Sequence, residues 1–156
     1  MEHDEPGLST SAHVEALADQ LSACADQLHI RLKAEAITVG AMPDGPARTR
    51  RRATVDRLLD AEQELRQRAN SLYADGAAAI VTRLGEPQQQ LIALTHAAAE
   101  RIRKIALVGD ATGLVAGLLV LAGGVASAQP GTVLTALETI RVQLKAVQAG
   151  LPPAPA

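Results

Sequence analysis

His96 and Glu100 are the two residues whose spacing comes closest to that of a ligand site. Four positions apart in an expected helix, they share one face and could both reach one metal ion. A protein metal site takes three or four ligands. The chain holds neither a second pair of this kind nor the Glu-x-x-His motif of di-iron bundles. We therefore expect a polar surface pair and no metal site, and a ligand- or metal-binding bundle ranks third among the candidate functions.

The other reactive side chains also lack partners at catalytic spacing. Cys24 is the only cysteine, which excludes an intrachain disulfide, and its apolar surroundings predict a buried thiol. His13 and His29 are expected at the surface or at the edge of the core. The first three residues could wrap Cu(II) or Ni(II), but such a terminus arises easily by chance. With no phosphate-binding loop, dinucleotide fingerprint or nucleophile elbow, the sequence predicts a non-enzymatic protein without cofactors.

Composition predicts an all-α fold of one domain. Ala and Leu supply 52 of the 156 residues, and both are strong helix formers. Tyr73 is the only aromatic residue, which disfavours a β-sandwich. It also removes the aromatic platform on which single-stranded nucleic acids stack.

Apolar residues at spacings of three and four recur in four stretches and predict amphipathic helices. Ser9, Thr10 or Ser11 is expected to cap the first helix. The lengths favour an antiparallel helical hairpin or four-helix bundle with long coiled-coil-like helices. The predicted single domain covers 11–150, with helices at 11–39, 47–84, 87–128 and 132–149, a flexible arm at 1–10 and a Pro-rich tail at 151–156.

Charge is distributed unevenly along a chain whose net charge is −2. Residues 1–46 hold eight acids and two bases, whereas 47–104 hold seven acids and eleven bases. The overall balance disfavours nucleic-acid binding. A basic run at the start of the second helix opposes the helix dipole and needs an anionic neighbour. The candidates are the acidic first helix, phospholipid head groups or nucleic-acid phosphates, and the residues expected to make this contact are Arg50, Arg51 and Arg52.

The most informative stretch is neutral and late in the chain. Residues 111–137 hold no charge, and 105–128, taken as one helix, would span about 36 Å against about 30 Å of bilayer hydrocarbon. Gly109, Gly113 and Gly117 recur every four residues, and Gly124 lies on the same side. Small residues at this interval let another helix approach closely. We expect these four glycines to form a helix-packing face.

Two interpretations of 105–128 stay open. In the first it inserts in a membrane, and Arg101, Arg103 and Lys104 hold the N-terminal region in the cytoplasm. In the second it forms the dry centre of a bundle or oligomer. Asp110 within the stretch and the lack of an aromatic belt count against insertion.

The sequence therefore predicts a helical interaction or assembly protein that associates with itself or with another helical protein. A soluble adaptor or chaperone with 105–128 buried is the alternative. A membrane is a further candidate partner. The acidic, polar start of the chain lacks the features of a secretory signal, so we expect a cytoplasmic or membrane-associated location.

Overall fold

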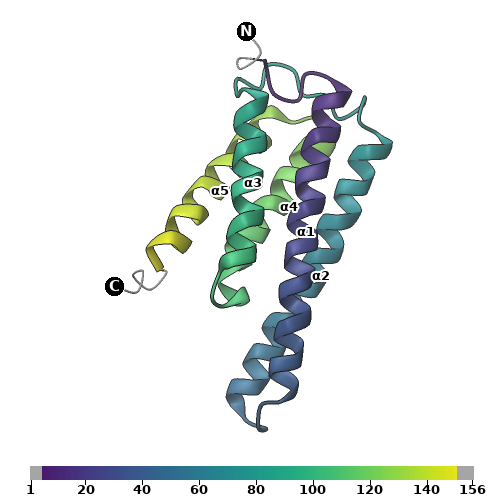
Figure 1. Ribbon diagram of the computed structural model, residues 1–156. Coiled ribbons are helices and arrows are strands. Elements are labelled where there is room, and N and C mark those ends of the chain that lie inside the picture. The colour runs from purple at the N-terminus through teal and green to yellow at the C-terminus, as the bar shows by residue number, and fades with distance from the viewer. Residues whose placement is uncertain (1–4, 151–156) are drawn as a thin grey trace.

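The computed structural model describes residues 5–150 and is all-helical there, which confirms the predicted fold class. The predicted tail at 151–156 and the first four residues lie outside this range. Five α-helices and one 3₁₀ helix follow one another along the chain (Figure 1): α1 Ser11–Gly40, α2 Pro46–Ala74, α3 Gln88–Lys104, η2 Val108–Ala111, α4 Thr112–Ala126 and α5 Pro130–Gly150.

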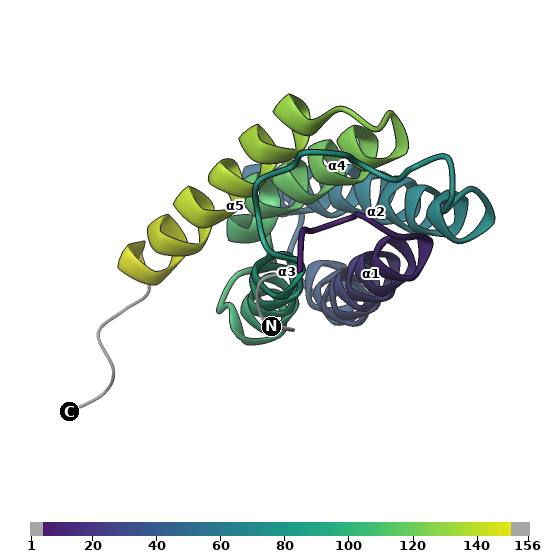
Figure 2. The ribbon, with the colours of Figure 1, turned by 90° about the horizontal axis from the view of Figure 1, so that it is seen from above.

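Successive helices run in alternating directions. Helix α1 packs against α2 and α3, α4 packs against α2 and α5, and α5 leans across α3 (Figures 1 and 2). The far end of the α1–α2 hairpin extends beyond the other three helices (Figure 1). The fold is thus a helical bundle with one projecting hairpin.

The stripe predicted along the first helix faces the core. Thr10 caps α1, because its hydroxyl accepts a hydrogen bond from the His13 N–H at 3.1 Å. The apolar positions that follow are fully buried, and their spacing of three and four accounts for the burial. These residues are Val14, Leu17, Leu21, Cys24, Leu28 and Leu32.

The second helix is shorter than predicted. It ends at Ala74, so the prediction of a helix through residue 84 is wrong. A turn follows, and the chain crosses the end of the bundle, where Val81 and Leu84 are buried outside any helix. The Val81 N–H donates to the Leu8 carbonyl at 2.9 Å. The apolar pattern therefore continues past α2 because the loop is buried.

The predicted helix at 87–128 is also wrong, because the chain leaves the helix at Ile105. Ile105 is extended (φ −61°, ψ 140°), and the next α-helix, α4, begins only at Thr112. Its 15 residues span about 22 Å. Together with η2, the helical stretch Val108–Ala126 is long and apolar enough to cross a membrane by length and composition, and 56% of it is buried inside the protein.

Arg31 of α1 binds the end of α3 at this break. Its guanidinium donates to the carbonyls of Ile102 at 3.1 Å and Arg103 at 3.0 Å, and to that of Ala106 at 3.4 Å. The last carbonyls of a helix have no partner within it, and a cation there also meets the negative end of the helix dipole. The side chain of Arg31 therefore stabilises the end of α3.

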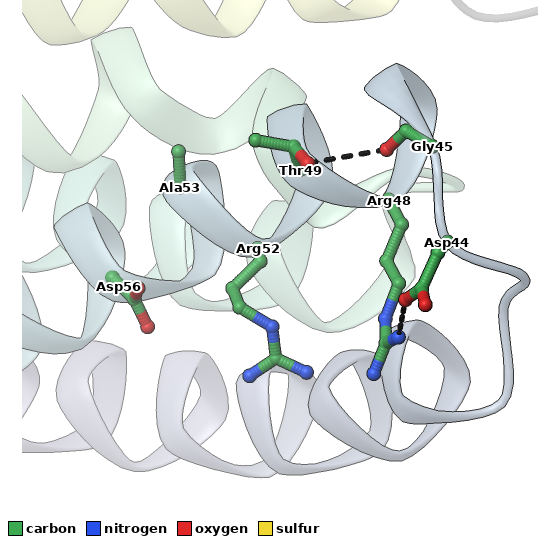
Figure 3. Close-up of a pocket in the computed structure, with 7 residues that line it drawn as sticks. All are labelled: Asp44, Gly45, Arg48, Thr49, Arg52, Ala53 and Asp56. Carbon is green, nitrogen blue, oxygen red and sulfur yellow. Dashed lines mark hydrogen bonds and ion pairs between the residues drawn. The ribbon is translucent and has the colours of Figure 1, made fainter.

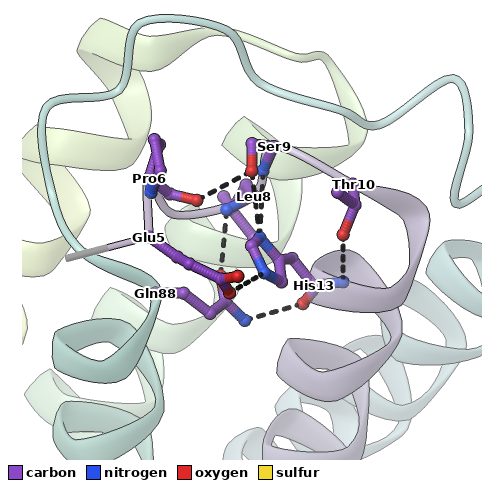
Figure 4. Close-up of polar contacts among 7 residues, drawn as sticks. All are labelled: Glu5, Pro6, Leu8, Ser9, Thr10, His13 and Gln88. Atoms are coloured by element: carbon purple, nitrogen blue, oxygen red, sulfur yellow. Dashed lines mark hydrogen bonds and ion pairs between the residues drawn. The ribbon is translucent and has the colours of Figure 1, made fainter. Parts of the chain in front are cut away.

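Residues 5–10 are not the flexible arm that the sequence predicts. Leu8 is fully buried, and its N–H donates to the side-chain oxygen of Gln88 at 2.9 Å. The Gly7 N–H donates to the Glu86 carbonyl at 2.7 Å, and the Gln88 N–H to the Glu5 carbonyl at 2.9 Å. This segment therefore ties the start of α1 to the start of α3 (Figure 4).

Candidate functional site

Three of the four predicted packing glycines face α5 of the same chain. A Cβ at Gly117 would lie 3.0 Å from Ile140 Cγ1, and one at Gly124 would lie 2.9 Å from Thr132 Cγ2. At Gly113 the Cβ would overlap the end of the Gln143 side chain. Because these glycines lack a side chain, α4 and α5 approach closely. Within the chain, the helix that lies against these three glycines is α5.

Gly109 is separate from the other three glycines. It lies in η2, before α4 begins, and a Cβ there would lie 3.2 Å from Thr54 Cγ2 of α2. The regular interval of four in the sequence therefore spans two structural elements. Gly109 belongs to the contact of the η2 turn with α2.

A charged pair of α2 lies against the middle of α4. The Arg68 guanidinium donates to the Leu119 carbonyl at 3.2 Å and to the Glu64 carboxylate at 2.8 Å. It also fills the space beside Gly123, where a Cβ would lie 2.4 Å from Arg68 Nη1. If α4 spanned a bilayer, an ion pair beside its middle would lie in the hydrocarbon, which is energetically costly. In the bundle, α4 has this polar neighbour on one side and α5 on another.

The cations expected to flank a membrane span lie at the end of α3. Arg103 donates to Glu100 at 2.8 Å, and Lys104 is 3.6 Å from the same carboxylate. The exposed Glu100 has its pKa lowered, chiefly by the hydrogen bond from Arg103. Arg101 is half-buried. All three also complement the negative end of the α3 dipole.

The basic run at the start of α2 has a partner in α1. Arg51 donates to the Glu35 carboxylate of that helix with two nitrogens, at 2.9 Å from Nε and 2.6 Å from Nη2. Arg48 pairs with Asp44 (Figure 3). Arg50 and Arg52 are exposed and make no ion pair within residues 5–150. The structure therefore pairs Arg51 internally and leaves its two neighbours available.

Figure 3 shows the hollow beside these residues, a shallow depression of about 600 Å³. It is lined by one face of the first turns of α2, including Thr49, Arg52 and Asp56, and by the two residues before the helix. The Thr49 hydroxyl donates to the Gly45 carbonyl at 3.1 Å. The depression combines two arginines with two aspartates, so it has no single charge.

Sequence reasoning missed a polar cluster between α1 and α2. Glu62 is only 4% exposed, and its carboxylate accepts a 2.7 Å hydrogen bond from His29 Nδ1. Arg66 Nε lies 3.5 Å from the other carboxylate oxygen, and Arg66 also donates to Asp26 at 2.8 Å. The bond to Asp26 and the charge of Glu62 raise the pKa of Arg66. The sequence did hold a sign of this cluster, because Glu62 occupies one of the positions along α2 that are otherwise apolar and face the core.

This cluster borders an open depression of about 390 Å³. His29 has a 56% exposed side chain, and Glu62 fixes the ring through Nδ1. A buried carboxylate that orients an accessible imidazole is the arrangement of a general base. The depression is lined by His29, Leu59, Glu62, Gln63 and Arg66, and none of these is a nucleophile of the Ser, Thr, Cys or Lys type. His29 and Arg66 pair the buried Glu62 carboxylate.

His13 also has partners that the sequence did not show (Figure 4). Its Nδ1 accepts from the Ser9 N–H at 3.3 Å, so Nε2 carries the proton and donates to Glu5 at 3.1 Å. The Ser9 hydroxyl donates to the Pro6 carbonyl at 2.9 Å. A serine, a histidine and a carboxylate thus lie in line, but the hydroxyl proton is committed to a backbone carbonyl. The arrangement holds the N-terminal segment in place.

The remaining candidates show no reactive geometry. Burial raises the pKa of Cys24 to about 12, so its thiol stays protonated. His96 is exposed, and residues 5–150 contain no group of three or more His, Cys, Asp or Glu placed to hold a metal ion. The copper- or nickel-binding terminus lies outside the described residues. Comparisons of the chain with protein-family models, curated proteins and solved structures find no match.

Proposed function

We propose that the protein is a non-enzymatic helical interaction module in which α4 is the core helix and α5 provides the surface for a helical partner. The observation that carries this proposal is the closure of the α4 glycine face by α5 of the same chain. The close helix contact that the glycines permit is therefore made between α4 and α5 within one chain. A partner then binds on the outer side of α5.

Two features support burial of α4 over insertion in a membrane. The Arg68–Glu64 pair lies against α4, which is compatible with a bundle in water and costly in lipid. The α-helical part, 15 residues, is shorter than the bilayer hydrocarbon. Membrane insertion is the second candidate, and its support is the apolar stretch Val108–Ala126.

The outer face of α5 suits a second copy of the same helix. Val142 is 51% exposed there, with Glu138 four residues before it and Lys145 three residues after. In an antiparallel pair of α5 helices centred near Val142, Glu138 of each copy would lie opposite Lys145 of the other. Such a two-fold contact forms the Glu138–Lys145 pair twice, in addition to the 3.7 Å contact that Glu138 already makes with Arg141 of its own helix. We therefore propose self-association through α5.

Light scattering on the full chain in detergent-free buffer tests both parts. We expect the protein to stay in the supernatant and its mass to rise above that of one chain with concentration. Val142→Asp should return it to one chain, whereas Val120→Asp, a matched change of an exposed valine on α4, should not. Glu138→Lys should weaken association, and Glu138→Lys combined with Lys145→Glu should restore it.

Recovery of the protein only with detergent would contradict the burial of α4. A single-chain mass at every concentration would contradict self-association through α5. A charge swap that fails to restore the association lost in Glu138→Lys would contradict the antiparallel register.

A further inference from the structure

The free end of the α1–α2 hairpin combines an apolar tip with basic flanks. From Ala36 to Ala47 the only charged residue is Asp44, and Asp44 is paired with Arg48. On either side of this tip, residues 33–35 and 48–57 together hold six cations against two acids. A charge-poor tip between cationic flanks differs from an ordinary solvated helix turn.

The tip projects beyond the rest of the bundle (Figure 1). Arg31 is level with the end of α3, because it binds the last carbonyls of that helix. Nine further helical residues carry α1 to Gly40, about 14 Å beyond that level. The tip can therefore meet a flat surface without hindrance from the other helices.

The projecting end is held in one shape by its own contacts. Val39 is 1% exposed, Met42 packs against the core cluster, and the Glu35–Arg51 pair joins the two helices at 2.6 Å. Ile37, in contrast, is the most exposed of the large hydrophobic residues described, at 71%. The tip thus presents an apolar side chain on a rigid support.

Four cations of residues 33–57 are exposed and without an ion pair in the described part of the chain: Lys33 on α1, and Arg50, Arg52 and Arg57 on α2. Lys33, Arg50 and Arg52 are the three nearest the tip along the helices. Arg50 and Arg52 point to different sides of α2, because two positions correspond to about 200° of helix. Together with Lys33 on α1, they place exposed cations on both helices behind the tip.

We propose that this tip docks on the surface of an anionic lipid bilayer. Ile37 and the apolar turn enter the head-group region, and Lys33, Arg50 and Arg52 contact the phosphates and acidic head groups. The docking is peripheral and leaves α4 inside the bundle. It goes beyond the proposed self-association, which uses α5 at the opposite side of α4 from α2.

Sedimentation of the full chain with vesicles tests the proposal. We expect binding to phosphatidylcholine vesicles that contain phosphatidylserine, and little binding to pure phosphatidylcholine. Each cation at such a surface contributes about fivefold in partitioning, so Arg50→Ala combined with Arg52→Ala should lower binding about 25-fold. Binding should also fall steeply as salt rises from about 0.15 M to about 1 M, as screening shortens the range of the charges.

Matched variants separate the tip from the rest of the surface. Ile37→Ser should weaken binding about tenfold, because an exposed apolar side chain no longer leaves water. Ile30→Ser changes an exposed isoleucine of the same helix, 59% exposed and two turns behind the tip, and should have no effect. Arg103→Ala with Lys104→Ala removes two cations at the end of α3 and should also leave binding unchanged.

Equal binding to neutral and anionic vesicles, or unchanged binding by the Arg50/Arg52 variant, would overturn the proposal. If the Arg50/Arg52 variant lost binding but Ile37→Ser bound fully, the contact would be purely ionic, as with an acidic protein. That result would also overturn the proposal. Protein that stays on the vesicles at about 1 M salt would be inserted through α4, which contradicts the proposed function as well. A loss of self-association alone leaves tip docking intact.

Discussion

Replacement of Gly117 by leucine should destabilise the folded chain. A Cβ at this position would already lie 3.0 Å from Ile140 Cγ1 and 3.4 Å from Thr139 Cγ2, and leucine adds three further carbons. Overpacking of this kind costs about 1–3 kcal/mol or more. The gain in helix propensity over glycine returns about 1 kcal/mol. We therefore expect a net loss of about 2 kcal/mol in the free energy of unfolding.

Urea unfolding followed by far-UV circular dichroism measures this loss. With a slope of about 1–3 kcal/mol/M, the midpoint should fall by about 1 M. Gly113→Ala is the matched control on the same helix, because its Cβ meets only the end of the Gln143 side chain, which can move aside. We expect this control to be neutral or slightly stabilising. A Gly117→Leu protein that unfolds at the wild-type midpoint but has a smaller oligomer would refute the reasoning, since the glycine face would then bind another chain.

Two further predictions concern buried titratable groups. The unfolded chain loses the Cys24 proton near pH 9 but the folded chain keeps it to about pH 12, so this group's stabilisation is complete below pH 9 and falls as pH rises through that window. Between about pH 8 and pH 10, the free energy of unfolding from urea titrations should fall by about 1 kcal/mol more in the wild type than in Cys24→Ala. An equal fall in the two proteins would contradict a buried thiol. His29→Ala should cost about 1–3 kcal/mol by leaving Glu62 underpaired, whereas Glu62→Leu should be neutral or stabilising. Equal destabilisation in the two variants, measured by urea unfolding, would argue against a buried ion pair.

The apolar spacing in the sequence was sufficient to predict an all-α bundle and the course of α1. It failed where a residue from another element decides the local structure. Gly109 and Asp110 weaken a helix beyond Ile105, but the carbonyls at the end of α3 are bound by Arg31, more than 70 residues earlier, and no local pattern shows that contact. The early end of α2 was missed because the loop after it is buried, and burial preserves an apolar pattern without requiring a helix.

The candidate site was also predicted only in part, because its contacts come from elements that lie far apart in the sequence. The glycine spacing predicted a close helix contact, and α5 lies against Gly117 and Gly124 in the structure, but a spacing cannot say which helix approaches. The basic run was expected to need an anion, and Glu35 supplies one for Arg51. The sequence could have predicted the buried carboxylate of Glu62, because this residue is a charge within a row of apolar positions. It could not have predicted the pairing with His29, because packing sets the register of α1 against α2.

Amide hydrogen exchange of the native full chain in detergent-free buffer tests the central claim, the burial of α4 within its own chain, most directly. Residues 114–125 should exchange among the slowest in the protein, through global unfolding, and their protection should be the same at low and high protein concentration. Rapid exchange across this stretch, or protection that appears only at high concentration or with detergent, would contradict the account.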